Sequence, residues 1–189
     1  MNAQSRGFTL VELLVVIALV AIILALAAPS FTSTLARKRL EGVASELATD
    51  LHYARSEAMQ RNASVGVVFG TNCYVIYTPA PGEYPASGCT ALGGPPGLPP
   101  IVLKSVAIEG GNSLNFVPAV ARLFPNYVAF DPVTGMAVGG LSGTEDVSGY
   151  IDASNGAGNW RIRALITKIG RVKQCSPNNT ITGLATDCQ

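Results

Sequence analysis

Hydrophobic and polar positions follow a different pattern in each of three parts of the chain. From Phe8 to Ala28 the residues are apolar apart from Thr9 and Glu12. At 1.5 Å per residue, a helix over this range would be about 30 Å long, which is the thickness of the hydrocarbon core of a bilayer. The first pattern therefore predicts a transmembrane helix over residues 8–28.

After Pro29 the apolar residues become periodic. They recur every three or four positions, as on one face of an α-helix, at Leu40, Val43, Leu47, Leu51, Ala54 and Ala58. Charged residues occupy the opposite positions, and Asn62 is a typical helix end signal. We expect residues 29–62 to continue the helix in amphipathic form, with an apolar stripe that needs a sheet to pack on.

From residue 63 onward, short runs rich in β-branched and aromatic residues predict strands. The runs are SVGVVF (64–69), CYVIY (73–77), IVLKSVAI (101–108), NYVAF (126–130), NWRIRALI (159–166) and RVKQC (171–175). Turn residues at 70–72 and 168–170 predict two hairpins, and the Gly- and Pro-rich stretch 82–100 predicts a long loop. One long helix followed by short strands indicates an α+β domain over residues 63–189, with the helix laid on an antiparallel sheet.

Composition argues against catalysis. Charged residues make up only 13% of the 189 residues, and His52 is the only histidine. A solvated position on the helix is the expected role of His52, and no Ser/His/Asp or Cys/His set is apparent. The acids Asp131, Glu145, Asp146 and Asp152 are expected in loops or at strand edges, and their spacing matches no EF-hand loop. We expect a protein that is not an enzyme and has no metal, cofactor or small-molecule substrate.

Four cysteines are present, and none forms a C-x-x-C pair. This count and spacing weaken zinc-binding and thioredoxin-like interpretations. If the domain lies outside the cytoplasm, two disulfides are the default. Of three pairings, Cys73–Cys89 with Cys175–Cys188 is favoured because each bridge closes a short loop; free thiols are the weaker alternative.

Glu12 is the unusual residue of the first pattern. A cleaved secretory signal would explain Arg6, the apolar run and the small residues near Ala27. It would not explain an acid in the run, because a charged group inside a membrane is costly and usually has a partner. Cleavage between Gly7 and Phe8 would create an α-amine one helical turn from Glu12. The amine and the carboxylate could then neutralise each other, within one chain or between staggered neighbours.

With Gly7, Phe8, Glu12 and Pro29 in these positions, the stretch RGFTLVELLVVIALVAIILALAAPSF resembles the class III signal and N-terminal helix of type IV pilins and type II secretion pseudopilins. The resemblance implies a leader over residues 1–7, cleavage by a prepilin peptidase and N-methylation of Phe8. It implies that Glu12 pairs with the N-terminus of a neighbouring subunit during assembly. It also implies a single-pass protein of the bacterial inner membrane with its C-terminal domain in the periplasm, and later a place in a pilus or pseudopilus.

The stretch WRIRALITKIGRVKQC predicts a basic hairpin. Alternation places Arg161 and Arg163 on one face of the first strand, and Arg171 and Lys173 on one face of the second, with Lys168 in the turn. Strand pairing would gather these cations in one patch. A solvated strand face, or a face that meets acidic partner subunits, is the competing explanation.

The order of helix, hairpin, irregular strands and terminal G-R-V-K-x-C resembles the GspH/FimT branch of pilin-like proteins. In the FimT branch, a C-terminal G-R-x-R motif is linked to DNA binding during natural transformation. The matching residues here are 170–173, and the last basic position is lysine. Lysine keeps the charge but loses the bidentate fork of arginine, so phosphate contact survives the change better than base readout.

Three functions remain open on these grounds. The first is a structural minor pilin or pseudopilin of a type IV pilus or a type II secretion system, with other pilin subunits as partners. The second is a DNA-binding minor pilin for DNA uptake, which would use the basic hairpin. The third is a membrane-anchored periplasmic domain with no filament role.

Overall fold

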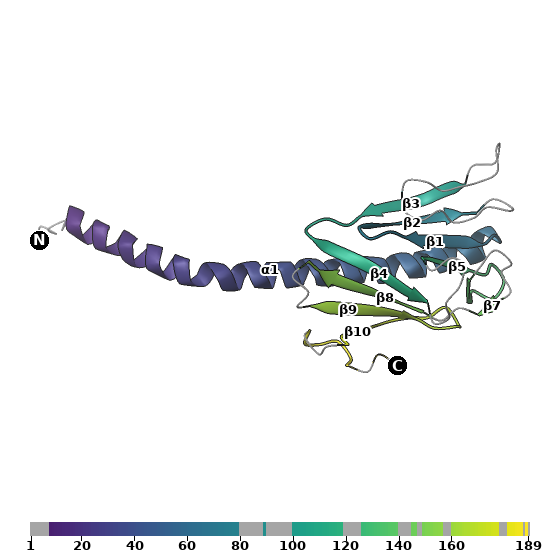
Figure 1. Ribbon diagram of the computed structural model, residues 1–189. Coiled ribbons are helices and arrows are strands. Elements are labelled where there is room, and N and C mark those ends of the chain that lie inside the picture. The colour runs from purple at the N-terminus through teal and green to yellow at the C-terminus, as the bar shows by residue number, and fades with distance from the viewer. Residues whose placement is uncertain are drawn as a thin grey trace, which may run out of the picture. The chain divides into compact units, whose positions relative to one another are not determined.

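The computed structural model describes residues 8–79, 89, 100–118, 126–139, 145–146, 149–156, 160–177, 181–186 and 188 (Figure 1). The chain divides into two compact units, residues 1–37 and residues 38–189. Helix α1 (Leu10–Arg61) begins in the first unit and ends in the second. Most of the predicted loop 82–100 lies outside the described residues.

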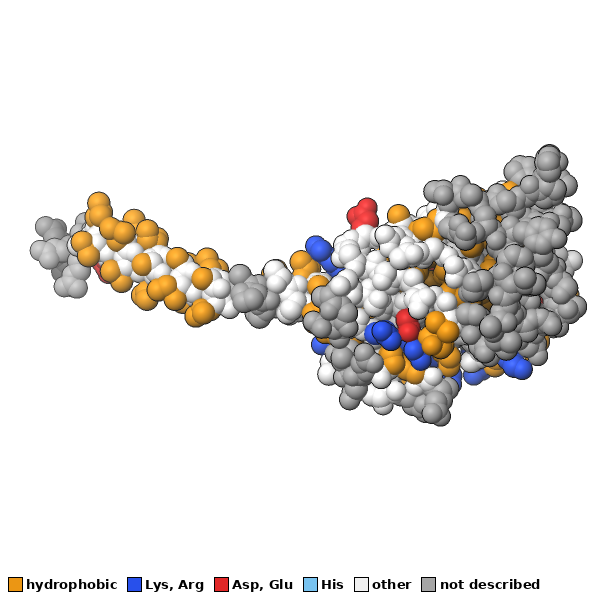
Figure 2. Space-filling model, viewed as in Figure 1, with side chains coloured by type: hydrophobic (Ala, Val, Ile, Leu, Met, Phe, Trp, Pro, Cys, Tyr) orange, Lys and Arg blue, Asp and Glu red, His pale blue; other side chains and the backbone are white. Residues whose placement is uncertain are grey.

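The first unit is helical from Leu10 onward, and its side chains from Phe8 to Leu26 are exposed. Figure 2 shows hydrophobic side chains over most of the visible surface of this segment. Within the described residues, no single helix is both long and apolar enough to cross a membrane. The stretches Leu10–Leu26 and Phe31–Arg61 meet the requirements of length and composition only when they are taken together.

In the second unit, α1 buries the predicted apolar stripe. The buried side chains are Leu40, Ala44, Leu47, Leu51, Ala54 and Ala58, and Val43 is partly buried beside them. The helix ends as expected, because Asn62 has a φ of 50° and the N–H of Ala63 donates to the carbonyl of Ala58 over 3.3 Å. A left-handed residue with such a bond is a common way to satisfy the last carbonyls of a helix.

Ten strands form two antiparallel sheets within the described part of the chain. The six-stranded sheet has the order β3 (Ile101–Ala107), β2 (Cys73–Thr78), β1 (Val65–Phe69), β5 (Tyr127–Phe130), β6 (Ala137–Gly139), β7 (Glu145–Asp146). The four-stranded sheet has the order β10 (Val172–Cys175), β9 (Arg161–Ile166), β8 (Gly149–Asn155), β4 (Asn112–Pro118). The expected α+β class is confirmed, but two sheets form where one was expected.

One hydrophobic core joins the helix to both sheets. Val67 and Phe69 of β1 belong to the same buried cluster as Leu47 of α1 and Ile162 and Ile166 of β9. Both predicted hairpins form, since β1 pairs with β2 and β9 pairs with β10. The sheets therefore hold the two hairpins and the second half of α1 around one core.

Strands β4 and β8 were not predicted, because their sequences NSLNFVP and GYIDASN contain many residues that strands usually lack. Pairing explains why they form, since β8 has hydrogen-bonded neighbours on both sides, β4 and β9. Its inward side chains Ile151 and Ala153 are buried in the core. Consequently Asp152 lies in the middle of a paired strand, and its expected place in a loop or at a strand edge was wrong.

Alanine substitution at two glycines should change the free energy of unfolding in opposite directions. Gly170 has a φ of 72°, and an added Cβ would lie 2.3 Å from the carbonyl oxygen of Gly135, so Gly170→Ala should cost about 2 kcal/mol or more. Gly42 lies inside α1 with no atom near its Cβ position, so Gly42→Ala should add about 0.5–1 kcal/mol. Urea unfolding of the detergent-solubilised chain, followed by Trp160 fluorescence, measures both; equal stability of the two variants would contradict this interpretation of the turn.

Candidate functional site

The N-terminus of α1 is capped by Thr9. The backbone N–H of Glu12 donates to the Thr9 Oγ1 over 3.2 Å, and the N–H of Leu13 donates to the Thr9 carbonyl over 3.2 Å. Thr9-Leu10-Val11-Glu12 has the T-x-x-E spacing of a capping box, and an acid in the first turn also suits the helix dipole. The sequence prediction missed this local role, although the spacing signals it.

Phe8, the expected first residue after cleavage, and Glu12, the expected assembly residue, are both exposed in the described part of the chain. Phe8 is 76% exposed, and the side chain of Glu12 is also exposed. Gly7, the other side of the expected cleavage point, lies outside the described residues. The structure thus shows an exposed acid within an exposed apolar helical surface.

The outer face of the four-stranded sheet carries the first two cations of the hairpin. Ile162, Ala164 and Ile166 are buried, whereas Arg161 and Arg163 lie on the opposite face, as the alternation predicted. The register pairs Asp152 of β8 with Arg163. Acidic and basic side chains lie together with hydrophobic ones on the visible face in Figure 2.

Asp152 binds both of these arginines. Arg163 donates from Nε over 2.8 Å to one carboxylate oxygen and from Nη2 over 3.0 Å to the other, and Arg161 Nη1 lies 3.7 Å from Asp152. This hydrogen bonding raises the pKa of Arg163 above its ordinary value. The guanidinium also lies 3.6 Å from the ring centroid of Tyr150, a cation–π contact. Arg163 is therefore held within the sheet and is poorly placed to reach a ligand.

The return strand carries the more accessible cations. Arg171 and Lys173 are exposed, and neither forms an ion pair with an acid that the structure describes. Lys168 lies in the turn, where its carbonyl accepts a hydrogen bond from the N–H of Ala137 over 3.2 Å. The pairing of β9 with β10 thus brings the five predicted cations to one hairpin. Asp152 offsets one of the two charges of Arg161 and Arg163, whereas Arg171 and Lys173 remain exposed.

Two disulfides are present, one at β2 of the six-stranded sheet and one at β10 of the four-stranded sheet. Cys73 is bonded to Cys89, and Cys175 to Cys188, with Cα separations of 6.1 and 5.6 Å. These are the two pairings that the short loops favoured. The second bridge holds the C-terminal segment against β10, where Ser176 donates its N–H to the carbonyl of Ala185 over 2.8 Å.

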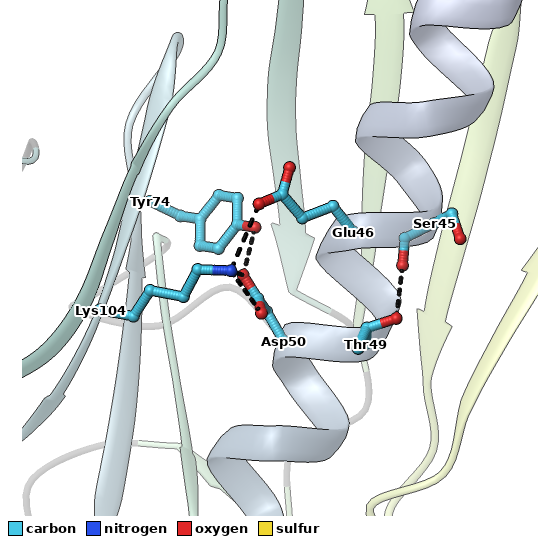
Figure 3. A network of polar contacts seen from close by, with 6 residues as sticks. All are labelled: Ser45, Glu46, Thr49, Asp50, Tyr74 and Lys104. Atoms are coloured by element: carbon cyan, nitrogen blue, oxygen red, sulfur yellow. Dashed lines mark hydrogen bonds and ion pairs between the residues drawn. The ribbon is translucent and has the colours of Figure 1, made fainter.

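A polar network links α1 to the six-stranded sheet (Figure 3). Asp50, only 6% exposed, accepts from the Tyr74 hydroxyl over 2.6 Å and lies 2.7 Å from the Lys104 ammonium. Lys104 also lies 3.3 Å from Glu46. Burial, followed by the Asp50 hydrogen bond, raises the pKa of Tyr74, and the Asp50 hydrogen bond raises that of Lys104. Both groups are thereby held in the forms that dominate at neutral pH.

The remaining candidates have structural explanations. His52 is exposed on α1, as expected. Asp131 accepts hydrogen bonds from the N–H groups of Val133 and Thr134 and from the Thr134 hydroxyl, which lower its pKa. Within the ranges that the structure describes, no three His, Cys, Asp or Glu residues are grouped to hold a metal.

A long N-terminal helix, apolar in its first half and packed in its second half on antiparallel sheets, is the architecture of type IV pilin-like proteins. Residues 43–170 match the family described as "Type II transport protein GspH", and residues 2–28 match the "Prokaryotic N-terminal methylation motif". Because the first match covers more than half of the chain, the protein belongs to the GspH family of type IV pilin-like proteins.

Individual relatives agree with this placement. The chain is 41% identical over 75 residues to the Pilin-like protein PilA1 of Thermus thermophilus, which is 38% of this chain and 47% of that protein. It thus spans about half the length of this curated relative. Two crystal forms of the type IV minor pilin FimU of Pseudomonas aeruginosa match with TM-scores of 0.53 and 0.50, at 15% and 14% identity. They cover 77% and 75% of this chain and 97% and 99% of the solved chains, so they show a common fold.

Proposed function

We propose that this protein is a minor pilin or pseudopilin subunit that is built into a type IV pilus or a type II secretion pseudopilus. The observation that carries the proposal is the N-terminal segment, in which an exposed acid lies among exposed apolar side chains within the match to the methylation motif. Such a surface is stable only in lipid or against similar helices. The domain after residue 38 would then be the part that faces neighbouring subunits or cargo.

Processing makes the segment ready for assembly. A prepilin peptidase would cut between Gly7 and Phe8, and the new α-amine of Phe8 would carry a positive charge and a methyl group. This amine and a Glu12 carboxylate of a neighbouring subunit neutralise each other, which lowers the cost of placing either charge in an apolar bundle. Before assembly the protein would be held in the bacterial inner membrane by residues 8–28, with residues 63–189 in the periplasm.

Mass spectrometry tests the processing step. Coexpression with a prepilin peptidase should remove residues 1–7 and add one methyl group at Phe8. Gly7→Ala is close in size but places a Cβ beside the scissile bond, so it should reduce the cleaved fraction at least about tenfold, a loss of about 1.4 kcal/mol in transition-state binding. A product that retains its first seven residues in the presence of an active peptidase would refute the proposed processing.

DNA capture is the alternative function that the basic hairpin supports. Arg171 and Lys173 are exposed at the return strand of the hairpin, whereas the cations of the first strand, Arg161 and Arg163, are partly neutralised by Asp152. Binding through so few charges would use phosphates and would show little sequence preference. Arg161 and Arg163 would contribute less than their number suggests.

Salt dependence tests DNA binding. Affinity of the detergent-solubilised chain for duplex DNA should fall as salt rises, and Arg171→Ala with Lys173→Ala should reduce the slope of log K against log salt by about two. The control pair Lys38→Ala with Arg61→Ala removes the same charge from ion pairs on α1 and should leave the slope nearly unchanged. Binding that is absent, or equally weakened by both pairs, would reject a role for the hairpin.

A further inference from the structure

Exposed apolar side chains gather where α1, the loop after β5 and the turn between β9 and β10 meet. Six large hydrophobic residues are exposed in the described part of residues 38–189, and three of them lie in the two turns and in the last turn of α1. They are Met59, Val133 and Ile169, which are 45%, 81% and 49% exposed. We call these three residues, with Arg55 and Arg171, the turn patch.

Close backbone packing holds the turn patch together. A Cβ on Gly135 would lie 3.1 Å from the Met59 sulfur and 2.9 Å from the Arg55 Nε, and one on Gly170 would lie 2.3 Å from the carbonyl oxygen of Gly135. The two turns therefore touch each other and rest on the last turns of α1, and in Figure 1 these segments lie toward the same end of the domain. Val133 and Ile169 are exposed residues of these two turns, within two positions of Gly135 and Gly170 along the chain.

The composition of both turns is unusual for loops that face only water. Turn tips usually carry Gly, Pro, Asn, Asp or Ser, yet Val133 and Ile169 stand at exposed positions in these turns. Neither belongs to the buried cores. Aliphatic side chains that add nothing to the core and are exposed together mark a surface that another molecule covers.

The charges around the turn patch indicate what kind of molecule would cover it. Arg171 is exposed without an acidic partner in the described ranges, and the Nε of Arg55 is buried without a hydrogen-bond acceptor there. Of the nearby acids, Glu57 pairs with Arg61, and the ionised carboxylate of Asp131 accepts hydrogen bonds from its own turn, so the two arginines outnumber the one acid without an ion pair. The patch is thus apolar at its centre and cationic at its edge, and it is complementary to aliphatic side chains flanked by carboxylates.

We propose that the turn patch docks an acidic and aliphatic segment of a neighbouring filament subunit, an inference that rests on the proposed function. Arginine and methionine are enriched at protein interfaces. DNA would offer the aliphatic side chains little to contact. Membrane-binding surfaces usually combine lysine-rich faces with Trp, Phe or Leu, and none of these large side chains is in the patch.

Photo-crosslinking in the intact filament system tests the inference. A benzoylphenylalanine at position 133 of the full-length chain should crosslink to one pilin-like subunit, at a segment that contains Asp or Glu. Arg171→Glu should reduce the crosslink about tenfold, and reversal of the crosslinked acid to Lys in the partner should restore it. Lys38→Glu, a charge reversal elsewhere in the domain, should have no effect, and the same probe at Ile101, which is 61% exposed on β3, should not reach that segment.

Three outcomes would overturn the inference. They are a crosslink to DNA or lipid, a protein crosslink that Arg171→Glu leaves unchanged, and absence of a crosslink in a chain that is cleaved and recovered in filaments. The last outcome would leave the proposed function standing. A chain that is not cleaved or never enters filaments would refute the proposed function as well, and mass spectrometry of the same samples separates the two cases.

Discussion

Replacement of Glu12 by glutamine is expected to abolish incorporation into filaments while the chain remains in the membrane and is still cleaved. The amide keeps the size of the side chain and suits the third position of a capping box. It removes only the negative charge that would neutralise the α-amine of a neighbouring Phe8. Loss of one partner from a buried charge pair costs about 3–5 kcal/mol, which lowers assembly a hundredfold or more.

The cap supplies the matched control for this experiment. Thr9→Ala removes the acceptor for the Glu12 N–H but keeps the carboxylate. It should cost about 1 kcal/mol of helix stability at the N-terminus and leave filament incorporation within severalfold of the unmodified protein. Sheared filaments and membrane fractions, each probed for the protein, measure both variants. Glu12→Gln protein in filaments at normal amounts would refute charge pairing, and a stronger defect in Thr9→Ala would assign Glu12 to capping.

The elements with strong local patterns could be predicted from the sequence. The period of the stripe from Leu40 to Ala58 fixed the buried face of α1, and Asn62 marked its end. In the same way, alternation in β9 separated Ile162 from Arg161 and Arg163. These features depend on neighbours within a few positions, which is the range over which sequence periodicity is informative.

The features that were missed depend on contacts between distant residues. Strand β8 contains Gly149, Asp152 and Asn155, which are residue types that strands usually lack, and it forms because strands on both sides bind its backbone. The same pairing brings Asp152 to Arg163 across 11 positions of sequence. The sequence therefore predicted one patch of five cations, whereas in the structure Asp152 pairs with Arg161 and Arg163, and Arg171 and Lys173 are the exposed cations at the return strand.

The network at Asp50 is the clearest case, since its partners lie 24 and 54 positions away in the sequence. Asp50→Ala should lower the free energy of unfolding by about 3 kcal/mol. The Tyr74 hydroxyl would lose its acceptor in a buried site, and Lys104 would keep only the longer contact with Glu46. Lys104 is 37% exposed, so water limits its share of the loss. Urea unfolding of the detergent-solubilised chain gives the value.

Thr49→Ala is the control, because Thr49 lies next to Asp50 on α1 but bonds only the carbonyl of Ser45 in its own helix (Figure 3). It should change stability by less than about 0.5 kcal/mol.

The pH dependence of the network adds a second check. The raised pKa values of Tyr74 and Lys104 mean that their contribution is complete below about pH 10 and is lost as the pH rises through the values in the folded state. The difference between Asp50→Ala and the unmodified protein should therefore be the same at pH 7 and pH 9. An equal loss in Thr49→Ala, or a difference that vanishes by pH 9, would show that this network does not hold α1 to the sheet.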